Sequence, residues 1–256
     1  MSWAQRRKAT YTLGFLVIII LIFVFIFLKF FNKQQTCFDG IKNQNELGID
    51  CGGQCTILCR AQYTDPTVLW TRWSKVTNAG TYNVLIYIQN SNLGIGAYKA
   101  PYSLSIYDKD NILLYSKKDY TYIPPSNNFT IFESDININD KIPARIDFTF
   151  STGFIWQKIE NEELNIVAIS KVIVDEDIKP KLLVTLKNKS LKEIDNIESV
   201  AILYDEDANA IAFSKTKIDL ITKDNTEDIV FTWPEKFEKK IYKIDVISKV
   251  IKSNVN

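Results

Sequence analysis

The feature that most constrains this chain is an apolar run near its start. From Leu13 to Leu28, sixteen residues carry no charge and no strong hydrogen-bonding side chain. As a helix, this run covers about 24 Å, and extension to residues 11–31 gives about 31 Å, close to a bilayer core of about 30 Å. A helix buried in a soluble core would need a polar face, which this segment lacks. The sequence therefore predicts a transmembrane helix at 11–31, with the lipid bilayer as partner and residues 1–10 as a cytoplasmic stub.

The flanks of the apolar run indicate an uncleaved anchor whose N-terminus lies in the cytoplasm. Residues 6–8 are all basic, whereas Lys29 and Lys33 follow the run, and the cytoplasmic flank usually carries the excess of basic residues. A cleaved signal peptide is the main alternative. Residues 30–36, however, offer no small side chains at the spacing that a signal peptidase reads. We therefore expect the bulk of the chain to lie outside the cell membrane as an extracytoplasmic region.

All four cysteines fall in one short segment, which we expect to form a module at residues 36–60. Cys37, Cys51, Cys55 and Cys59 follow the spacing C-x13-C-x3-C-x3-C, which lacks the paired C-x2-C knuckles of a zinc ribbon. Thiols oxidise outside the cytoplasm, so an even number in a short segment predicts disulfides. The sequence therefore predicts two disulfide bonds, with all three pairings open.

The cysteine segment also carries a recognisable motif. The pattern C-x-D-G-x-x-N-x-x-E-x-G-x-D-C-G-G-x-C resembles a short cysteine-rich module that recurs in bacterial surface and secreted proteins. The matching residues are Asp39-Gly40, Asn43, Glu46, Gly48 and Asp50 to Gly53. This resemblance covers a small part of the chain; it implies an extracytoplasmic location and carries no activity.

Oxygen-bearing side chains in the same segment make calcium a candidate cofactor. Asp39, Asn43, Glu46 and Asp50 lie in a loop punctuated by glycine, and calcium prefers carboxylate and carbonyl oxygens. Their spacing is not that of an EF-hand loop. The alternative, which we favour, is that Asp and Asn cap turns while Gly supplies positive φ. We expect no other cofactor.

Beyond Cys59 the sequence changes to short alternating runs of β-forming residues, broken by Asn, Asp, Gly and Pro. Runs at this spacing, with few helical periodicities between them, predict an all-β fold of the sandwich type. The expected strands are 84–88, 104–107, 112–115, 129–132, 144–150, 164–169, 182–186, 200–204, 210–213, 229–233 and 241–247. We expect Trp70, Trp73, Trp156 and Trp233 to lie in the sandwich cores.

The two halves of this β region align with each other at an offset of 97 or 98 residues. In each half a strand ends in Asn (Asn90, Asn188), and a later strand ends in Tyr-Asp before a tight turn. An offset of this size is typical of one immunoglobulin-sized domain. The sequence therefore predicts two tandem immunoglobulin-like sandwiches, residues 66–158 and 164–252, joined by a short acidic linker around Glu160 to Glu163.

The Asn, Leu/Ile-Tyr-Asp and turn pattern is similar to the FxLYD-like immunoglobulin-type domains of bacterial envelope proteins. In the second half, Asn188 and residues 203–205 and 229–231 match the pattern. The first half has Ile-Tyr-Asp at 106–108, but its loop at 92–98 departs from it. That family is a scaffold, so the resemblance implies surface exposure and no chemistry.

Composition excludes several functions. The 31 basic and 30 acidic side chains nearly cancel, whereas a nucleic-acid binder needs a concentrated basic face. The chain contains no histidine, which removes the commonest general base and every His-ligated metal site. No G-x-S-x-G, S-x-x-K or P-loop motif occurs. We assign no catalytic residue, although carboxylate-only chemistry such as glycoside hydrolysis needs just two acids.

Two functions are compatible with these features. The first is a single-pass, membrane-anchored scaffold or interaction protein of the bacterial cell envelope, with envelope proteins as partners and no enzymatic activity. The second is a surface module that binds a small ligand or glycan through sandwich-end loops at 92–98 and 123–128. Exposed aromatic side chains beside those loops would favour the second function.

Overall fold

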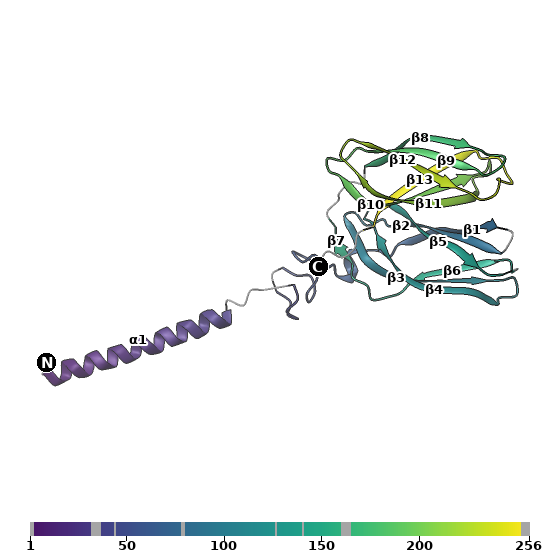
Figure 1. Ribbon diagram of the computed structural model, residues 1–256. Helices are drawn as coiled ribbons and strands as arrows, with labels where there is room; N and C mark the ends of the chain where they lie inside the picture. The colour runs from purple at the N-terminus through teal and green to yellow at the C-terminus, as the bar shows by residue number, and fades with distance from the viewer. Residues whose placement is uncertain are drawn as a thin grey trace. The chain divides into compact units, whose positions relative to one another are not determined.

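The computed structural model describes residues 3–31, 37–43, 45–77, 80–125, 127–139, 141–159 and 165–251. The chain forms two compact units, Met1–Cys55 and Thr56–Asn256, and we describe each unit by itself. Apart from one long N-terminal helix and a short 3-10 turn, the described elements are β-strands (Figure 1). The expected linker at 160–163 lies outside the described residues.

The first unit begins with the predicted helix, α1 (Trp3–Phe31). Its segment Thr10–Phe27 is long and apolar enough to cross a membrane, and none of that segment is buried. A helix with exposed apolar side chains on all faces is unfavourable in water, because none of its apolar surface is removed from solvent. The helix therefore has the character of a membrane anchor or of a signal sequence.

The first part of the second unit is an antiparallel sandwich, here sandwich 1. Its sheets are β1-β2-β5 and β4-β3-β6, and the short β7 pairs with β3. Its core contains residues from both sheets, including Val84, Leu104 and Phe129, together with Trp156 from the segment before β7. The strands are β1 (Thr67–Thr77), β2 (Thr81–Gln89), β3 (Ile95–Tyr107), β4 (Leu113–Ile123), β5 (Asn128–Asn137), β6 (Arg145–Phe150) and β7 (Gln157–Lys158), preceded by the 3-10 turn η1 (Arg60–Gln62).

The rest of the second unit is another antiparallel sandwich, here sandwich 2. Its sheets are β12-β9-β8 and β11-β10-β13, and its core includes Leu182, Leu203, Phe231 and Trp233. The all-β fold of two sandwiches is thus as predicted. The strands are β8 (Ile166–Val174), β9 (Lys181–Asn188), β10 (Ile194–Tyr204), β11 (Ala210–Ile221), β12 (Thr226–Thr232) and β13 (Lys243–Val250).

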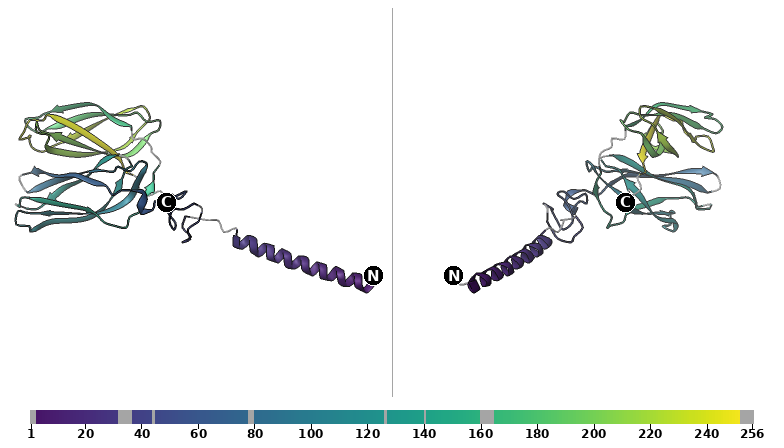
Figure 2. Two further views of the ribbon diagram at one scale, coloured as in Figure 1. Left: turned by 180° about the vertical axis from the view of Figure 1, so that it is seen from behind. Right: turned by 60° about the vertical axis from the view of Figure 1, so that its left-hand side comes forward.

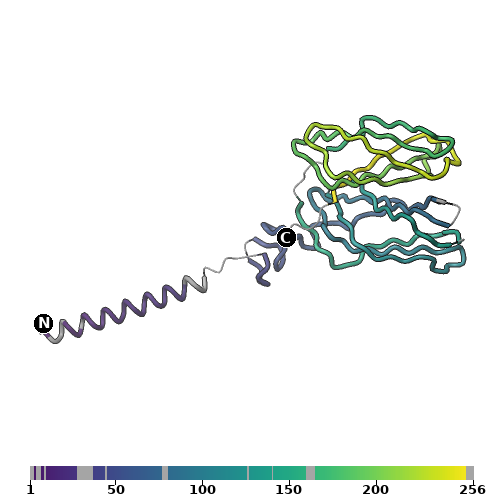
Figure 3. Tube along the Cα trace, viewed as in Figure 1, coloured from purple at the N-terminus to yellow at the C-terminus, as the bar shows by residue number. Residues whose placement is uncertain are grey.

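The two sandwiches repeat one strand topology. The trace in Figure 3 shows the two similar bodies, and the register shows that they correspond residue by residue. Tyr107 ends β3 and pairs with Arg145 of β6, while Tyr204 ends β10 and pairs with Lys243 of β13. The predicted equivalence of the two tyrosines is therefore confirmed.

Asn90, which directly follows β2, and Asn188, which ends β9, also play the same role. The side-chain amide of Asn90 donates to Ile95 O at 2.8 Å and to Pro124 O at 2.7 Å. Asn188 is fully buried, and its amide donates to Ile221 O at 3.1 Å across the sandwich. Each amide satisfies loop carbonyls that would otherwise be buried without a donor, so each asparagine ties one end of its sandwich together.

The Tyr-Asp turns are also equivalent. In both turns the aspartate, Asp108 or Asp205, accepts hydrogen bonds from the backbone amides two and four residues later. The residue three positions later has a positive φ: 59° at Asn111 and 60° at Ala208. Asparagine tolerates this left-handed conformation, whereas alanine adopts it at a cost.

The sandwiches pack on each other through sheet faces, which the sequence analysis did not predict. Leu85 and Phe132, on the outer face of sheet β1-β2-β5, pack against Val200, Ile202 and Phe213 of sheet β11-β10-β13. The rings of Phe132 and Phe213 meet edge to face at 6.0 Å. The views in Figure 2 show the stacked layers. Strands β2 and β10 are consequently buried on both faces.

The segment after Cys55 belongs to sandwich 1 rather than to a separate module. The amide of Leu58 donates to Trp156 O at 2.9 Å, and the amide of Lys158 donates to Thr56 O at 2.9 Å. Leu58 is also a core residue of sandwich 1. The region expected at 36–60 is therefore divided between the two units.

Candidate functional site

The cysteine segment is held by disulfide bonds. Cys37 and Cys55 form a disulfide with a Cα–Cα distance of 5.6 Å. Cys51 and Cys59 are also disulfide-bonded, and no cysteine of the chain is free. The predicted two disulfides are thus present, and the Cys37–Cys55 bond removes the other two pairings that the sequence left open.

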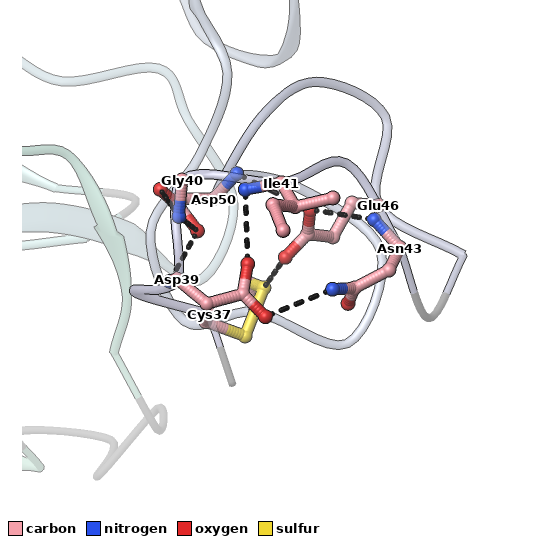
Figure 4. The surroundings of a disulfide bond; sticks show 8 residues. Cys37, Asp39, Gly40, Ile41, Asn43, Glu46 and Asp50 are labelled. Atoms are coloured by element: carbon pink, nitrogen blue, oxygen red, sulfur yellow. Dashed lines mark hydrogen bonds between the residues drawn. A yellow bond between two sulfur atoms is a disulfide. The ribbon is translucent and has the colours of Figure 1, made fainter. Parts of the chain in front are cut away.

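Two aspartates fold the start of this segment (Figure 4). The Asp50 carboxylate accepts the backbone amides of Asp39 at 3.0 Å and of Gly40 at 2.9 Å. The Asp39 carboxylate in turn accepts the Ile41 amide at 2.9 Å and the Asn43 side-chain amide at 2.9 Å. Both side chains therefore bind loop N–H groups, as capping residues do.

The buried acid of the segment is Glu46, which is 5% exposed. One carboxylate oxygen accepts the backbone amides of Asn43 and Asp50, both at 3.2 Å. The other oxygen lies 3.3 Å from Cys55 Sγ, a contact without a hydrogen bond because a disulfide sulfur carries no proton. Glu46 thus links the two halves of the loop beside the disulfide.

The structure brings the four candidate calcium ligands into one loop. The three carboxylates face the loop's own backbone, whereas Asn43 Oδ1 is buried and accepts no hydrogen bond from the described residues. Asp39, Glu46 and Asp50 each accept backbone amides, which are the contacts of turn-capping residues. The sulfur atoms near Glu46 are in a disulfide, so they cannot act as thiolate ligands. This geometry supports the turn-capping alternative, and calcium binding stays a prediction.

Gly53, the second glycine of the motif's Gly-Gly pair, lies where two chain segments approach closely. It has a φ of 58°, and a Cβ placed there would lie 2.1 Å from Asn45 O. Any other residue would have to move the backbone of the neighbouring turn. The glycine is therefore needed for the close approach of two chain segments, independently of any ligand.

The loops named for the alternative ligand site meet where Ala97 pairs with Ile123. Asn92 is 8% exposed and accepts the Thr64 amide at 2.8 Å. Tyr98 and Tyr122 lie with ring centroids 5.7 Å apart, and neither is among the exposed large hydrophobic residues. Tyr98, the aromatic residue of these loops, thus faces Tyr122 of β4, whereas Tyr120 of the same strand is 58% exposed.

A groove occurs instead on the side of sandwich 1. It has a volume of about 450 Å³ and lies between β1 and β6, lined by Val68, Trp70 and Thr71 of β1 and by residues 146–149 of β6. Trp70, which we expected in the core, packs partly at the interface between the sandwiches. The other three tryptophans contribute to the cores as expected.

One buried acid lies at the edge of the core of sandwich 1. Glu133 accepts hydrogen bonds from the Tyr102 hydroxyl and from Lys117 Nζ, the latter at 2.8 Å. Burial, together with the Glu133 charge, raises the pKa of Tyr102. Burial opposes protonation of Lys117, but Asp119 and Glu133 outweigh it and raise the pKa of Lys117. Glu133 is thus held as an ion pair.

A second buried acid lies where the sandwiches meet. Glu198 contacts Lys249 Nζ at 3.0 Å and Lys215 Nζ at 3.3 Å. Both lysines also donate across the interface, Lys249 to Thr130 O at 2.6 Å and Lys215 to Phe132 O at 3.3 Å. Burial opposes ionisation of Glu198, yet the two ammonium groups lower its pKa. Burial also lowers the pKa of Lys249.

Comparisons with known proteins add little. No family model matches the chain, and no curated protein matches it, so both resemblances stated above stay predictions. Among solved structures, red sea bream transglutaminase is 10% identical at a TM-score of 0.22, covering 73% of this chain and 32% of its own. A β-glucuronidase from glycoside hydrolase family 2 is 10% identical at a TM-score of 0.21, covering 68% and 24%. The chain spans less than a third of the length of either protein, and these TM-scores carry no argument about activity.

Proposed function

We propose that this protein is a single-pass, membrane-anchored scaffold or interaction protein of the cell envelope, with its sandwiches outside the cytoplasm. The observation that carries the proposal is the oxidised cysteine segment directly behind an apolar helix. Disulfides persist in oxidising compartments, and the helix is long enough to cross a bilayer. The cytoplasmic flank would be the basic residues 6–8.

A structural role suits the packing of the second unit. The sandwiches are joined by an apolar interface and by a buried ion network. This packing favours one rigid spacer over two domains that move independently. The buried acids Glu133 and Glu198 are each engaged by lysine. Ion-paired carboxylates of this kind serve the fold, and we propose that the protein is not an enzyme.

The proposal is tested by crosslinking in intact cells. Cells that express the full chain are treated with a membrane-impermeant crosslinker, and the products are identified by mass spectrometry against a strain without the protein. A defined envelope protein that is recovered in repeated experiments supports the interaction role. Recovery of cytoplasmic proteins alone would contradict it.

A further inference from the structure

The two sandwiches differ at the seam between the first and the last strand of each. In sandwich 2, Lys171 of β8 reaches across the seam, and its ammonium donates to Ile244 O of β13 at 2.7 Å. Lys171 pairs with Val184 of β9, and Ile244 pairs with Leu203 of β10. These partners define the register position of each residue.

In sandwich 1 the same two register positions hold Thr71 and Ile146. Thr71 pairs with Ile86, four residues before Asn90. Lys171 pairs with Val184, four residues before Asn188. Because the two asparagines are equivalent, Thr71 occupies the position of Lys171. Ile146 pairs with Ile106, the residue before the tyrosine that ends its strand. A threonine side chain is too short to cross the seam as lysine does, and the groove between β1 and β6 lies at this place.

The charges beside the two seams are alike. In sandwich 1, Arg145 and Asp147 form an ion pair at 2.8 Å, and in sandwich 2, Lys243 and Asp245 form the equivalent pair at 2.6 Å. Each last strand thus carries one ion pair beside the residue whose carbonyl is at issue, and sandwich 1 has in addition the Arg72 guanidinium, which donates to Thr71 O at 3.0 Å.

We propose that this groove binds an extended peptide segment of a partner protein, which places a lysine ammonium on Ile146 O. Strands β1 and β6 are both sheet edges, and edge strands offer hydrogen bonds to an added extended segment. Val68, Trp70 and Phe148 supply an apolar lining for the neighbouring side chains. The inference rests on the proposed interaction role and names the chemistry of the partner.

The test uses the full chain in lipid nanodiscs and biolayer interferometry. One immobilised peptide alternates valine and threonine around a single central lysine, and its match carries norleucine at the centre. We expect saturable binding of the lysine peptide and binding weaker by roughly tenfold or more for the norleucine peptide, as for loss of one charge-assisted hydrogen bond. Thr71→Lys should abolish binding because the new side chain closes the seam, whereas Thr67→Lys adds the same charge outside the groove and should leave binding intact.

Three results would overturn the proposal. The first is equal affinity of the nanodisc protein for both peptides, and the second is no binding of either peptide at the highest nanodisc concentration tested. The third is undiminished binding by Thr71→Lys protein that retains its near-ultraviolet circular dichroism. Association between nanodiscs that Thr71→Lys removes would show instead that the groove holds a second copy. Because these measurements use purified protein, their failure leaves the membrane-anchored location standing, and a failure of the crosslinking experiment leaves the peptide result standing.

Discussion

The buried ion network between the sandwiches predicts a large effect of one conservative substitution. Glu198→Gln keeps the shape of the side chain but removes the negative charge between Lys249 and Lys215. The Lys249 side chain is only 10% exposed, and that of Glu198 is 9% exposed, so water cannot replace the lost charge. Breaking a buried ion pair on one side costs about 3–5 kcal/mol. Since glutamine still offers an acceptor oxygen, we expect about 3 kcal/mol.

The measurement is thermal or denaturant unfolding of the full chain in nanodiscs, followed by near-ultraviolet circular dichroism. A loss of about 3 kcal/mol corresponds to a fall in Tm of roughly 6–12 °C for a unit of this size. The control is Asp65→Asn, which breaks the Arg60–Asp65 pair; the two side chains are 64% and 66% exposed. Exposed pairs contribute less than about 1 kcal/mol.

A double replacement checks the cause. When Glu198→Leu is combined with Lys249→Met, the two most buried charges of the network disappear together, and only Lys215, whose side chain is 25% exposed, loses its partner. Part of the lost stability should therefore return, because a buried pair is often replaceable by apolar residues. A loss below about 1 kcal/mol for Glu198→Gln, or a loss no larger than that of Asp65→Asn, would refute the reasoning. Either result would mean that the network is solvated and does not hold the interface.

Three further predictions follow from other parts of the chain. The folded-state pKa of Glu198 lies below its ordinary value. As pH decreases below about 4.3, this carboxylate is therefore protonated in the unfolded chain before it is protonated in the folded chain, which favours unfolding. In unfolding experiments at a series of pH values, wild-type stability should thus fall more steeply than that of Glu198→Gln. Cys37→Ser should cost the loop about 3 kcal/mol and make the Cys55 thiol react with an alkylating reagent, as mass spectrometry would show. Ala208→Asn, which copies Asn111 of the first repeat, should raise the free energy of unfolding by about 1 kcal/mol, since asparagine tolerates a positive φ; an unchanged or lower value would show that the turn is not strained.

The sequence predicted the helix, the disulfides, the β class and the repeat because each depends on local patterns. All eleven expected strands overlap observed ones, and alternation with turn residues is a strong signal over short runs. Strand β1 (Thr67–Thr77) was missed because it is an edge strand in which Arg72 and Lys75 interrupt the apolar residues. The two-residue β7 is too short for any pattern.

The interface between the sandwiches was not predicted for a different reason. Leu85 and Val200 lie on strands whose core faces are also apolar, and continuous apolar runs do not reveal what covers the second face. The partners of Glu198 lie on other strands and so depend on tertiary register. For the same reason, the residues Asp39 and Asp50 were recognised as loop-forming, but their bonds to backbone amides required the structure.

The measurement that tests the account most directly is the side of the membrane on which the sandwiches lie. The native cysteines are all disulfide-bonded, so a single introduced cysteine would be the only thiol that a maleimide can label. Leu191 is 83% exposed, and Leu191→Cys in intact cells should react with a membrane-impermeant maleimide, while Ser2→Cys should react only after the membrane is permeabilised. Labelling of Ser2→Cys in intact cells, with Leu191→Cys protected until lysis, would contradict the membrane-anchored, extracytoplasmic account.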